Sequence, residues 1–274
     1  MITIVTDSTA YLTKGQAHKL GVSLVPVSFI IDGKSFSESF ADQKGRYEAQ
    51  IGEHIFQCTT AHPPISTFVA AFEKELEAGN EVLCIVMSSR LSGTYSSATL
   101  AAQELNDRRI AVVDSLSTAG GQYLLIKKAR ELIDAGMGLH EVAAQLEQIK
   151  KQVGTAFSVD NMDALRRSGR LGLVRQSVSA ILNIRPLLTL KDGAIVADGM
   201  ARGRTEQIRA LIAKVPPQAS RVVAEYFGPS VEPKKITAAL KQAGIHADVT
   251  VSRIGPVLGI HLGLGVVGLA WLCD

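Results

Sequence analysis

The sequence has few cysteines and only a small net charge, and each of these features excludes a class of protein. Its three cysteines, Cys58, Cys84 and Cys273, lack metal-ligand spacing, and Cys84 lies in an apolar strand-like segment. We therefore expect reduced thiols and a cytoplasmic location. The formal net charge is only +3 and no basic stripe carries interleaved aromatics, so we expect no nucleic-acid partner. The opening residues, MITIVTDST, lack the basic and apolar regions of a secretory signal.

Motifs for nucleotide binding and nucleophilic catalysis are also missing. The sequence has no GxxxxGK[ST] loop, and no GxGxxG follows its first strand-like segment. HExxH and CxxC do not occur, the LSGTY segment is not a GxSxG elbow, and the six histidines are scattered. We therefore expect no cofactor, no metal site and no catalysis by the chain alone.

One long apolar segment raises the question of a membrane span. Residues 254–272, IGPVLGIHLGLGVVGLAWL, contain no Asp, Glu, Lys or Arg. They also contain five glycines, a proline and His261, which argue against a spanning helix. We expect a buried strand, a loop and a final helix here, and no stable membrane insertion. A peripheral membrane protein that uses this segment is one alternative.

Helix and strand patterns alternate through the first half of the chain. Short apolar runs predict strands at 1–5, 22–31, 81–87 and 109–114, and helical patterns cover 13–21, 65–79, 92–105 and 120–136. This alternation predicts a doubly wound, mostly parallel sheet with an α/β fold. The Asp-Gly pairs at Asp32 and Asp192 predict hairpin turns.

The pattern changes after about residue 152. Strands are predicted near 155–160, 220–228 and 246–255, a hairpin at 184–201 and a helix at 232–244. This is a mixed α+β pattern. We therefore expect two domains, a parallel α/β domain at 1–152 and a smaller α+β domain at 153–274, with the ligand between them.

Three predicted strands of the first half end in hydroxyl-rich segments. These are IVTDST at 4–9, VMSSRLSGT at 86–94 and VVDSLST at 112–118. Ligands bind at the carboxyl ends of strands in open parallel sheets, and helix N-termini favour anions. Helix capping is the ordinary explanation for any one of these residues, Ser92 included. Together they predict a polar crevice that holds a small anion with neutral donors.

Eight motifs, in order along the whole chain, resemble those of the DegV family of bacterial fatty-acid-binding proteins. They are TDSTA, TTAHPP, SSRLSGTYSSA, VVDSLST, LRRSGRLG, LNIRPLLTLKDGAI, ARGR and GIHLGLG. The resemblance implies a two-domain α/β fold with a long-chain fatty acid, C14 to C18, in a tunnel between the domains. It also implies that the bound acid is presented to a fatty acid kinase, which forms an acyl phosphate.

The resemblance also implies residue roles. Thr60 and Ser92 would contact the carboxylate, and His261 would complete the polar network. The turn at Ser92 would also aim the backbone N–H of Gly93 at the anion. Arg202, in ARGR, matches a position with which the family engages the kinase.

The sequence departs from the family motifs around these positions. Ala61 and His62 stand where the family has Ser and Gln, and Leu262 and Leu264 replace Thr and Pro. Tyr11 stands where an acid is usual. These changes bear on chain preference and kinase pairing more than on lipid binding.

The residues by themselves leave other interpretations open. An enzyme acting on a small phosphorylated or acyl substrate in the same crevice is the alternative to a lipid carrier. The arginines of LRRSGR, at 166, 167 and 170, predict a solvated face or a surface for an acidic partner. A fatty acid suits a crevice of neutral donors, because about fourteen buried methylenes would contribute about 11 kcal/mol before the costs of binding.

Overall fold

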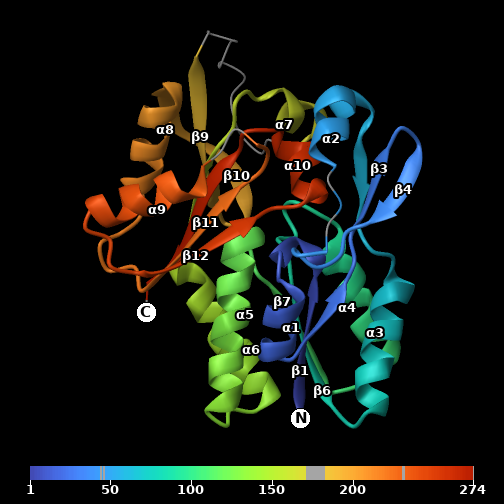
Figure 1. Cartoon of the computed structure of the whole chain (residues 1–274). Coiled ribbons are helices and arrows are strands. Elements are labelled where there is room, and N and C mark those ends of the chain that lie inside the picture. The colour runs from blue at the N-terminus through green and yellow to red at the C-terminus, as the bar shows by residue number, and fades with distance from the viewer. Residues whose placement is uncertain (44, 46, 171–182, 230–231, 274) are drawn as a thin grey trace.

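The strands of the described residues form three sheets (Figure 1). The computed structural model describes residues 1–43, 45, 47–170, 183–229 and 232–273. The last two residues of the LRRSGRLG motif and the first of LNIRPLL lie outside these ranges. The fold is α/β, with an N-terminal parallel sheet and a separate mixed sheet, which confirms the predicted fold class.

The first sheet is parallel and has the order β2-β1-β6-β7. Its strands are β1 (Ile2–Asp7), β2 (Val22–Val25), β6 (Glu81–Val86) and β7 (Ile110–Asp114). The central strands are apolar on both faces because helices cover both sides of the sheet. One side packs against α3 (Ile65–Glu77) and α4 (Thr94–Leu105). The other packs against α1 (Lys14–Leu20), α5 (Ala119–Asp134) and α6 (Leu139–Ile149).

The segment 22–31, predicted as one strand, is two strands in different sheets. Residues before Pro26 form β2 in the parallel sheet, and residues after it form β3 (Ser28–Ile31). Proline has no N–H for a strand ladder, so the chain leaves the parallel sheet there. β3 pairs antiparallel with β4 (Lys34–Ser37) and β5 (Thr59–Ala61) in a three-stranded sheet. The predicted turn is confirmed, since Asp32 and Gly33 both have positive φ.

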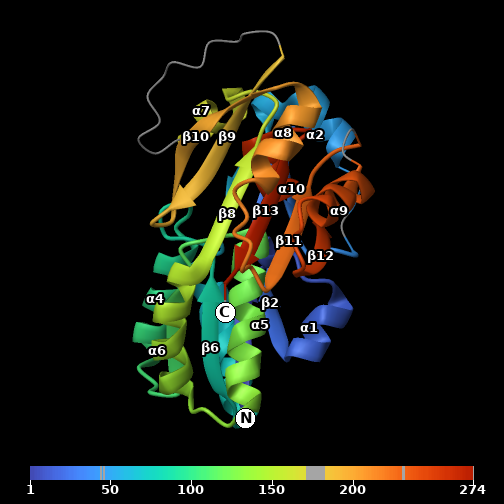
Figure 2. The same ribbon diagram turned by 90° about the vertical axis from the view of Figure 1, so that its left-hand side faces the viewer.

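The mixed sheet has the order β10-β9-β8-β13-β11-β12. Its strands are β8 (Val153–Ser158), β9 (Ile184–Lys191), β10 (Ala194–Arg202), β11 (Arg221–Tyr226), β12 (Asp248–Arg253) and β13 (Val267–Leu272). Helices α8 (Gly203–Ile212) and α9 (Pro233–Gln242) lie on one face (Figure 2). The β9–β10 hairpin turns at Asp192 and Gly193, as predicted.

Helix α5 packs against both the parallel and the mixed sheet. A single apolar cluster contains Ile4 of β1, Leu125 of α5 and Leu272 of β13. Gly120 allows close contact, because a Cβ there would lie 2.8 Å from the Cβ of Val223 on β11. The helix therefore connects the elements before residue 152 with those after it.

The apolar segment 254–272 has the reverse of the predicted order. A helix comes first, α10 (Pro256–Leu262), and the strand β13 follows it. Gly263 and Gly265, both at positive φ, separate the two elements. β13 lies between β8 and β11, which accounts for its continuous apolar run. In the described part of the chain, helices long and apolar enough to cross a membrane do not occur.

Two further short helices stand beside α10. They are α2 (Glu48–His54) and α7 (Asp163–Ser168), and both contact α10 near the top of Figure 1. Single turns of 3-10 helix lie at Ser8–Ala10, Ile55–Gln57 and Lys150–Gln152. Residues that follow β6 and β7 come together at one place with Thr60 of β5 and His261 of α10.

Candidate functional site

A mostly apolar cavity lies at this place. It has an empty volume of about 970 Å³, including space open to solvent. Its wall draws on elements from both halves of the chain, such as Val27, Met87, Leu190 and Leu258. The polar side chains of the lining belong to Thr60, His62, Ser92, Thr118, Thr155, Arg170, Glu225, Tyr226 and His261.

Two of the predicted contact residues are bonded to each other. Strand β5 carries Thr60 and the last turn of α10 carries His261, with 2.7 Å between Thr60 Oγ1 and His261 Nε2. Burial lowers the pKa of His261 to about 4, and the Arg170 and Arg167 guanidinium groups act in the same direction. The imidazole is therefore neutral at pH 7. Its buried Nδ1 has no hydrogen-bond partner among the described residues.

Ser92 lies in the turn that leads into α4. Its Oγ accepts the Thr94 N–H at 3.3 Å and lies 2.9 Å from Thr94 Oγ1. The N-cap position of α4 belongs to Gly93, so Ser92 stands one residue before the cap. A hydroxyl has two acceptor sites and one hydrogen. The two groups of Thr94 can fill the acceptor sites, which leaves the Ser92 hydrogen for a ligand.

The departures from the family motifs differ in their distance from the cavity. The His62 ring covers Gly93, because a Cβ on that glycine would lie 3.0 Å from the ring atoms Cε1 and Nε2. Leu262 lines the cavity, whereas Leu264 packs against Gly52 of α2. Ala61 is exposed on β5. His62 and Leu262 are therefore the departures that border the cavity.

Arg170 contributes to the cavity, although LRRSGR had suggested a solvated face or a partner surface. Its Nε donates to the Leu91 carbonyl at 3.3 Å, and its Nη1 donates to the Ser168 carbonyl. The side chain is half-buried in the cavity lining, while Arg166 and Arg167 are exposed. A cation at the wall favours an anionic ligand group nearby.

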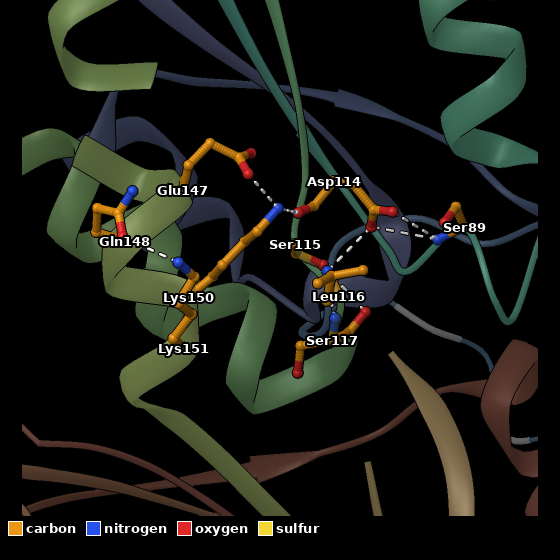
Figure 3. Close-up of polar contacts among 9 residues, drawn as sticks. All are labelled: Ser89, Asp114, Ser115, Leu116, Ser117, Glu147, Gln148, Lys150 and Lys151. Atoms are coloured by element: carbon orange, nitrogen blue, oxygen red, sulfur yellow. Dashed lines mark hydrogen bonds and ion pairs between the residues drawn. The ribbon is translucent and has the colours of Figure 1, made fainter. Parts of the chain in front are cut away.

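Most hydroxyls at the three strand ends hold loops together. At the end of β7, the Asp114 carboxylate accepts the N–H groups of Ser89 at 3.2 Å and Leu116 at 3.0 Å (Figure 3). Ser115 Oγ accepts the Ser117 N–H at 3.1 Å, which tightens the same turn. The predicted polar crevice thus consists of fewer hydroxyls than the sequence offered, with Ser92 and Thr118 of these segments in the cavity lining.

Asp7 fixes the loop that carries Ser92. Its buried carboxylate accepts the Met87 N–H at 2.8 Å, the Thr9 N–H at 3.0 Å and the Gln122 side-chain amide at 3.0 Å. Burial raises the pKa of Asp7, and these donors oppose the rise. The carboxylate therefore positions the start of the Ser88–Ser92 turn from within the parallel sheet.

Tyr11 and Glu38 hold the N-terminus of α10. Glu38 accepts the Val257 N–H at 3.0 Å, and the Leu258 N–H donates to the Tyr11 hydroxyl oxygen at 3.2 Å. Both side chains are buried. The tyrosine at the departure position therefore anchors the helix whose last turn carries His261.

Arg202 lies away from the cavity. It is the last residue of β10 and the N-cap of α8, and its side chain is exposed. It does not belong to the cavity lining. The structure thus brings Thr60, Ser92 and His261 together in the lining of one cavity and places Gly93 against the His62 ring, whereas Arg202 lies on the surface.

Comparisons with known proteins agree over the full length of the chain. The sequence model of a family described as "Uncharacterised protein, DegV family" matches residues 1–274. A DegV domain-containing protein of Halalkalibacterium halodurans is 32% identical over 281 residues, which cover 100% of this chain and 99% of that protein.

Solved structures agree as well. A DegV family protein from Thermus thermophilus, with fatty acid binding described, is 31% identical with a TM-score of 0.83, covering 100% of this chain and 99% of that one. DegV of Bacillus subtilis, described as a fatty acid binding protein, is 27% identical with a TM-score of 0.84 and the same coverage. The chain belongs to the DegV family.

Proposed function

We propose that this protein binds a long-chain fatty acid, C14 to C18, without covalent attachment. The acid occupies a tunnel between two domains, residues 1–152 and 153–274. The main support is that Thr60, Ser92 and His261 share the wall of one mostly apolar cavity. Fatty acid binding by the relatives from Thermus thermophilus and Bacillus subtilis supports the same ligand.

The carboxylate binds at Ser92, Thr60 and the N-terminus of α4. Ser92 donates its hydrogen while it accepts from Thr94, so every site of its hydroxyl is used. The backbone N–H of Gly93 and the positive end of the α4 dipole add to the attraction. His62 and Arg170 flank this position.

His261 acts through Thr60. The neutral imidazole donates from Nε2 to Thr60 Oγ1, and Thr60 then donates its own hydrogen to the carboxylate. The opposite tautomer would take the Thr60 hydrogen and leave the carboxylate without it. Ligand binding therefore selects the Nε2–H tautomer, and the nearby negative charge raises the pKa of His261 from its low value.

The protein acts as a carrier and carries out no reaction alone. The tail supplies most of the affinity, since about fourteen buried methylenes contribute about 0.8 kcal/mol each. The head group is oriented by hydrogen-bond donors, and the half-buried Arg170 guanidinium in the cavity wall adds an attraction. A fatty acid kinase then receives the presented acid and forms the acyl phosphate, and the exposed Arg202 contacts that partner.

The test is identification of the ligand followed by its rebinding. Denaturing solvent extraction with mass spectrometry should find about one C14 to C18 acid per chain in the purified protein. Delipidated, folded protein should then bind such acids in calorimetry. Absence of affinity for every acid in this range would contradict the proposal.

A further inference from the structure

His62 stands at the open end of the cavity. It directly follows β5, and side chains two residues apart along a strand point to the same side. Accordingly Thr60 and His62 both line the cavity, and Ala61 between them does not. Thr60 is half-buried, whereas His62 is exposed. The histidine therefore has one side toward the cavity and one toward solvent, which places it at the mouth.

The imidazole ring lies flat against Gly93. A Cβ on Gly93 would be 3.0 Å from Cε1 and Nε2 of His62 and 3.2 Å from Nδ1. A point at nearly equal distances from three neighbouring ring atoms lies over the face of the ring, because a point beyond the Cε1 edge would be clearly farther from both nitrogens. Gly93 follows Ser92 and is the N-cap of α4. The ring is therefore held beside Ser92, at the start of the helix.

Both ring nitrogens of His62 are available to a ligand. Among the residues that the structure describes, neither nitrogen has a hydrogen bond or an ion pair. His261 differs, because its Nε2 is bonded to Thr60 Oγ1. A neutral imidazole carries one N–H and one acceptor nitrogen, and a protonated imidazole carries two N–H groups. Since neither nitrogen of His62 is engaged, whichever lies nearer a ligand can carry the hydrogen.

A bound carboxylate has room for this donor. It has about four acceptor sites, and Ser92, Thr60 and the Gly93 N–H supply three donors in the binding mode proposed above. An acceptor site that loses water and gains no donor is unfavourable. Thr60 and Ser92 are more buried than His62, so the remaining acceptor site is on the side of the mouth. His62 lies on that side.

We propose that His62 is a further side chain that binds the head group of the fatty acid, and that its ring N–H donates to the carboxylate oxygen on the solvent side. The proposal rests on the fatty acid binding proposed above and adds a residue to the same site. A donor at this position favours an ionised carboxylate over an uncharged head group, because hydrogen bonds to charged acceptors are the stronger ones. His62 is therefore a determinant of head-group specificity.

Three variants separate the N–H donor from the ring that carries it. His62→Phe keeps a flat ring for Gly93 without an N–H, His62→Gln keeps a donor without the ring, and His62→Ala has neither. In calorimetry on delipidated protein, the Phe and Ala variants should bind hexadecanoic acid about five- to tenfold more weakly than the wild type, since water at the mouth replaces part of the lost bond. His62→Gln should stay within about threefold of the wild type. His246→Ala, at an exposed histidine outside the cavity lining, is the control and should bind as the wild type does.

The alcohol 1-hexadecanol tests whether the carboxylate is the group that His62 binds. It has the same tail and an uncharged head group, so the wild type and His62→Phe should bind it with affinities within about twofold of each other. A second measurement needs no variant. In the wild type, the assigned ring ¹⁵N signals of His62 should shift more on addition of hexadecanoic acid than on addition of 1-hexadecanol.

The outcomes separate this inference from the proposed function. If hexadecanoic acid binds the wild type and folded His62→Phe equally, or if the acid leaves the His62 ring signals in place, the donor is not used; the inference is then wrong and fatty acid binding stands. If His62→Gln loses as much affinity as His62→Phe, or if the alcohol is weakened as much as the acid, His62 only shapes the mouth and the inference is overturned. If no acid binds the wild type, both proposals are wrong.

Discussion

Replacement of Ser92 by alanine separates a ligand contact from a hydrogen bond that only stabilises the turn before α4. The Ser92 hydroxyl accepts the Thr94 N–H, so its loss should lower the stability of the delipidated protein by about 1 kcal/mol or less. If the same hydroxyl also donates to a carboxylate, binding loses a bond to a charged group, worth about 1.5–3 kcal/mol. Affinity for hexadecanoic acid should then fall by about ten- to a hundredfold.

The assay measures urea unfolding and fatty acid calorimetry on the same delipidated samples. Ser96→Ala replaces an exposed serine on α4, the helix that follows Ser92; it is the matched control and should change neither quantity appreciably. Thr60→Ala should weaken binding similarly, and the double variant should lose less than the sum because both residues serve one carboxylate. Lower stability with unchanged affinity for Ser92→Ala would refute the head-group assignment.

Three other perturbations test separate parts of the structure. The pKa of His261 is about 4 in the fold and about 6.5 unfolded, so stability is full above pH 6.5 and should fall by up to about 3 kcal/mol toward pH 4. Urea titrations should show that the free energy of unfolding depends less on pH in His261→Gln than in the wild type. The same dependence in the two proteins would contradict this. Arg202→Ala should reduce kinase-dependent acyl-phosphate formation and leave the affinity for the fatty acid unchanged. Arg209→Ala, at another exposed arginine, is the control. If Arg202→Ala lowers acyl-phosphate formation and fatty acid affinity equally, Arg202 supports the lipid site instead. Gly120→Ala should lower the free energy of unfolding by about 1–3 kcal/mol, because the new Cβ would contact Val223 of β11. Gly15→Ala is the control and should not lower it, because the space around Gly15 is open. Equal denaturation midpoints for the two variants would refute the close packing of α5.

The sequence predicts the regular strands, helices and hairpin turns of this fold because local patterns determine them. Apolar runs and helical periodicity locate the four parallel strands, and Asp-Gly pairs locate two hairpins. The split at Pro26 is a tertiary effect, since an apolar run does not reveal which sheet each half joins. The order of α10 and β13 was missed because the glycines there fit a helix or a strand equally. Helix α6 was not predicted, although Val142 and Leu146 are four residues apart on its buried face.

The candidate site was only partly predictable. The family motifs singled out Thr60, Ser92 and His261, but their meeting at one cavity depends on β5, α4 and α10, which are far apart in sequence. Arg170 and Glu225 were missed as lining residues. The available signal for Glu225 was a charged residue inside the apolar run RVVAEYF, which is unusual unless a partner stabilises it.

The most direct test of the central claim is the ¹³C NMR signal of hexadecanoic acid labelled at its carboxyl carbon and bound to the delipidated protein. The account predicts one bound resonance, shifted from that of the free acid, that moves in Ser92→Ala and Thr60→Ala. It predicts that the same resonance stays in place in Ser96→Ala, because that exposed serine lies outside the cavity lining. A carboxyl resonance that stays in place in both Ser92→Ala and Thr60→Ala would contradict the account.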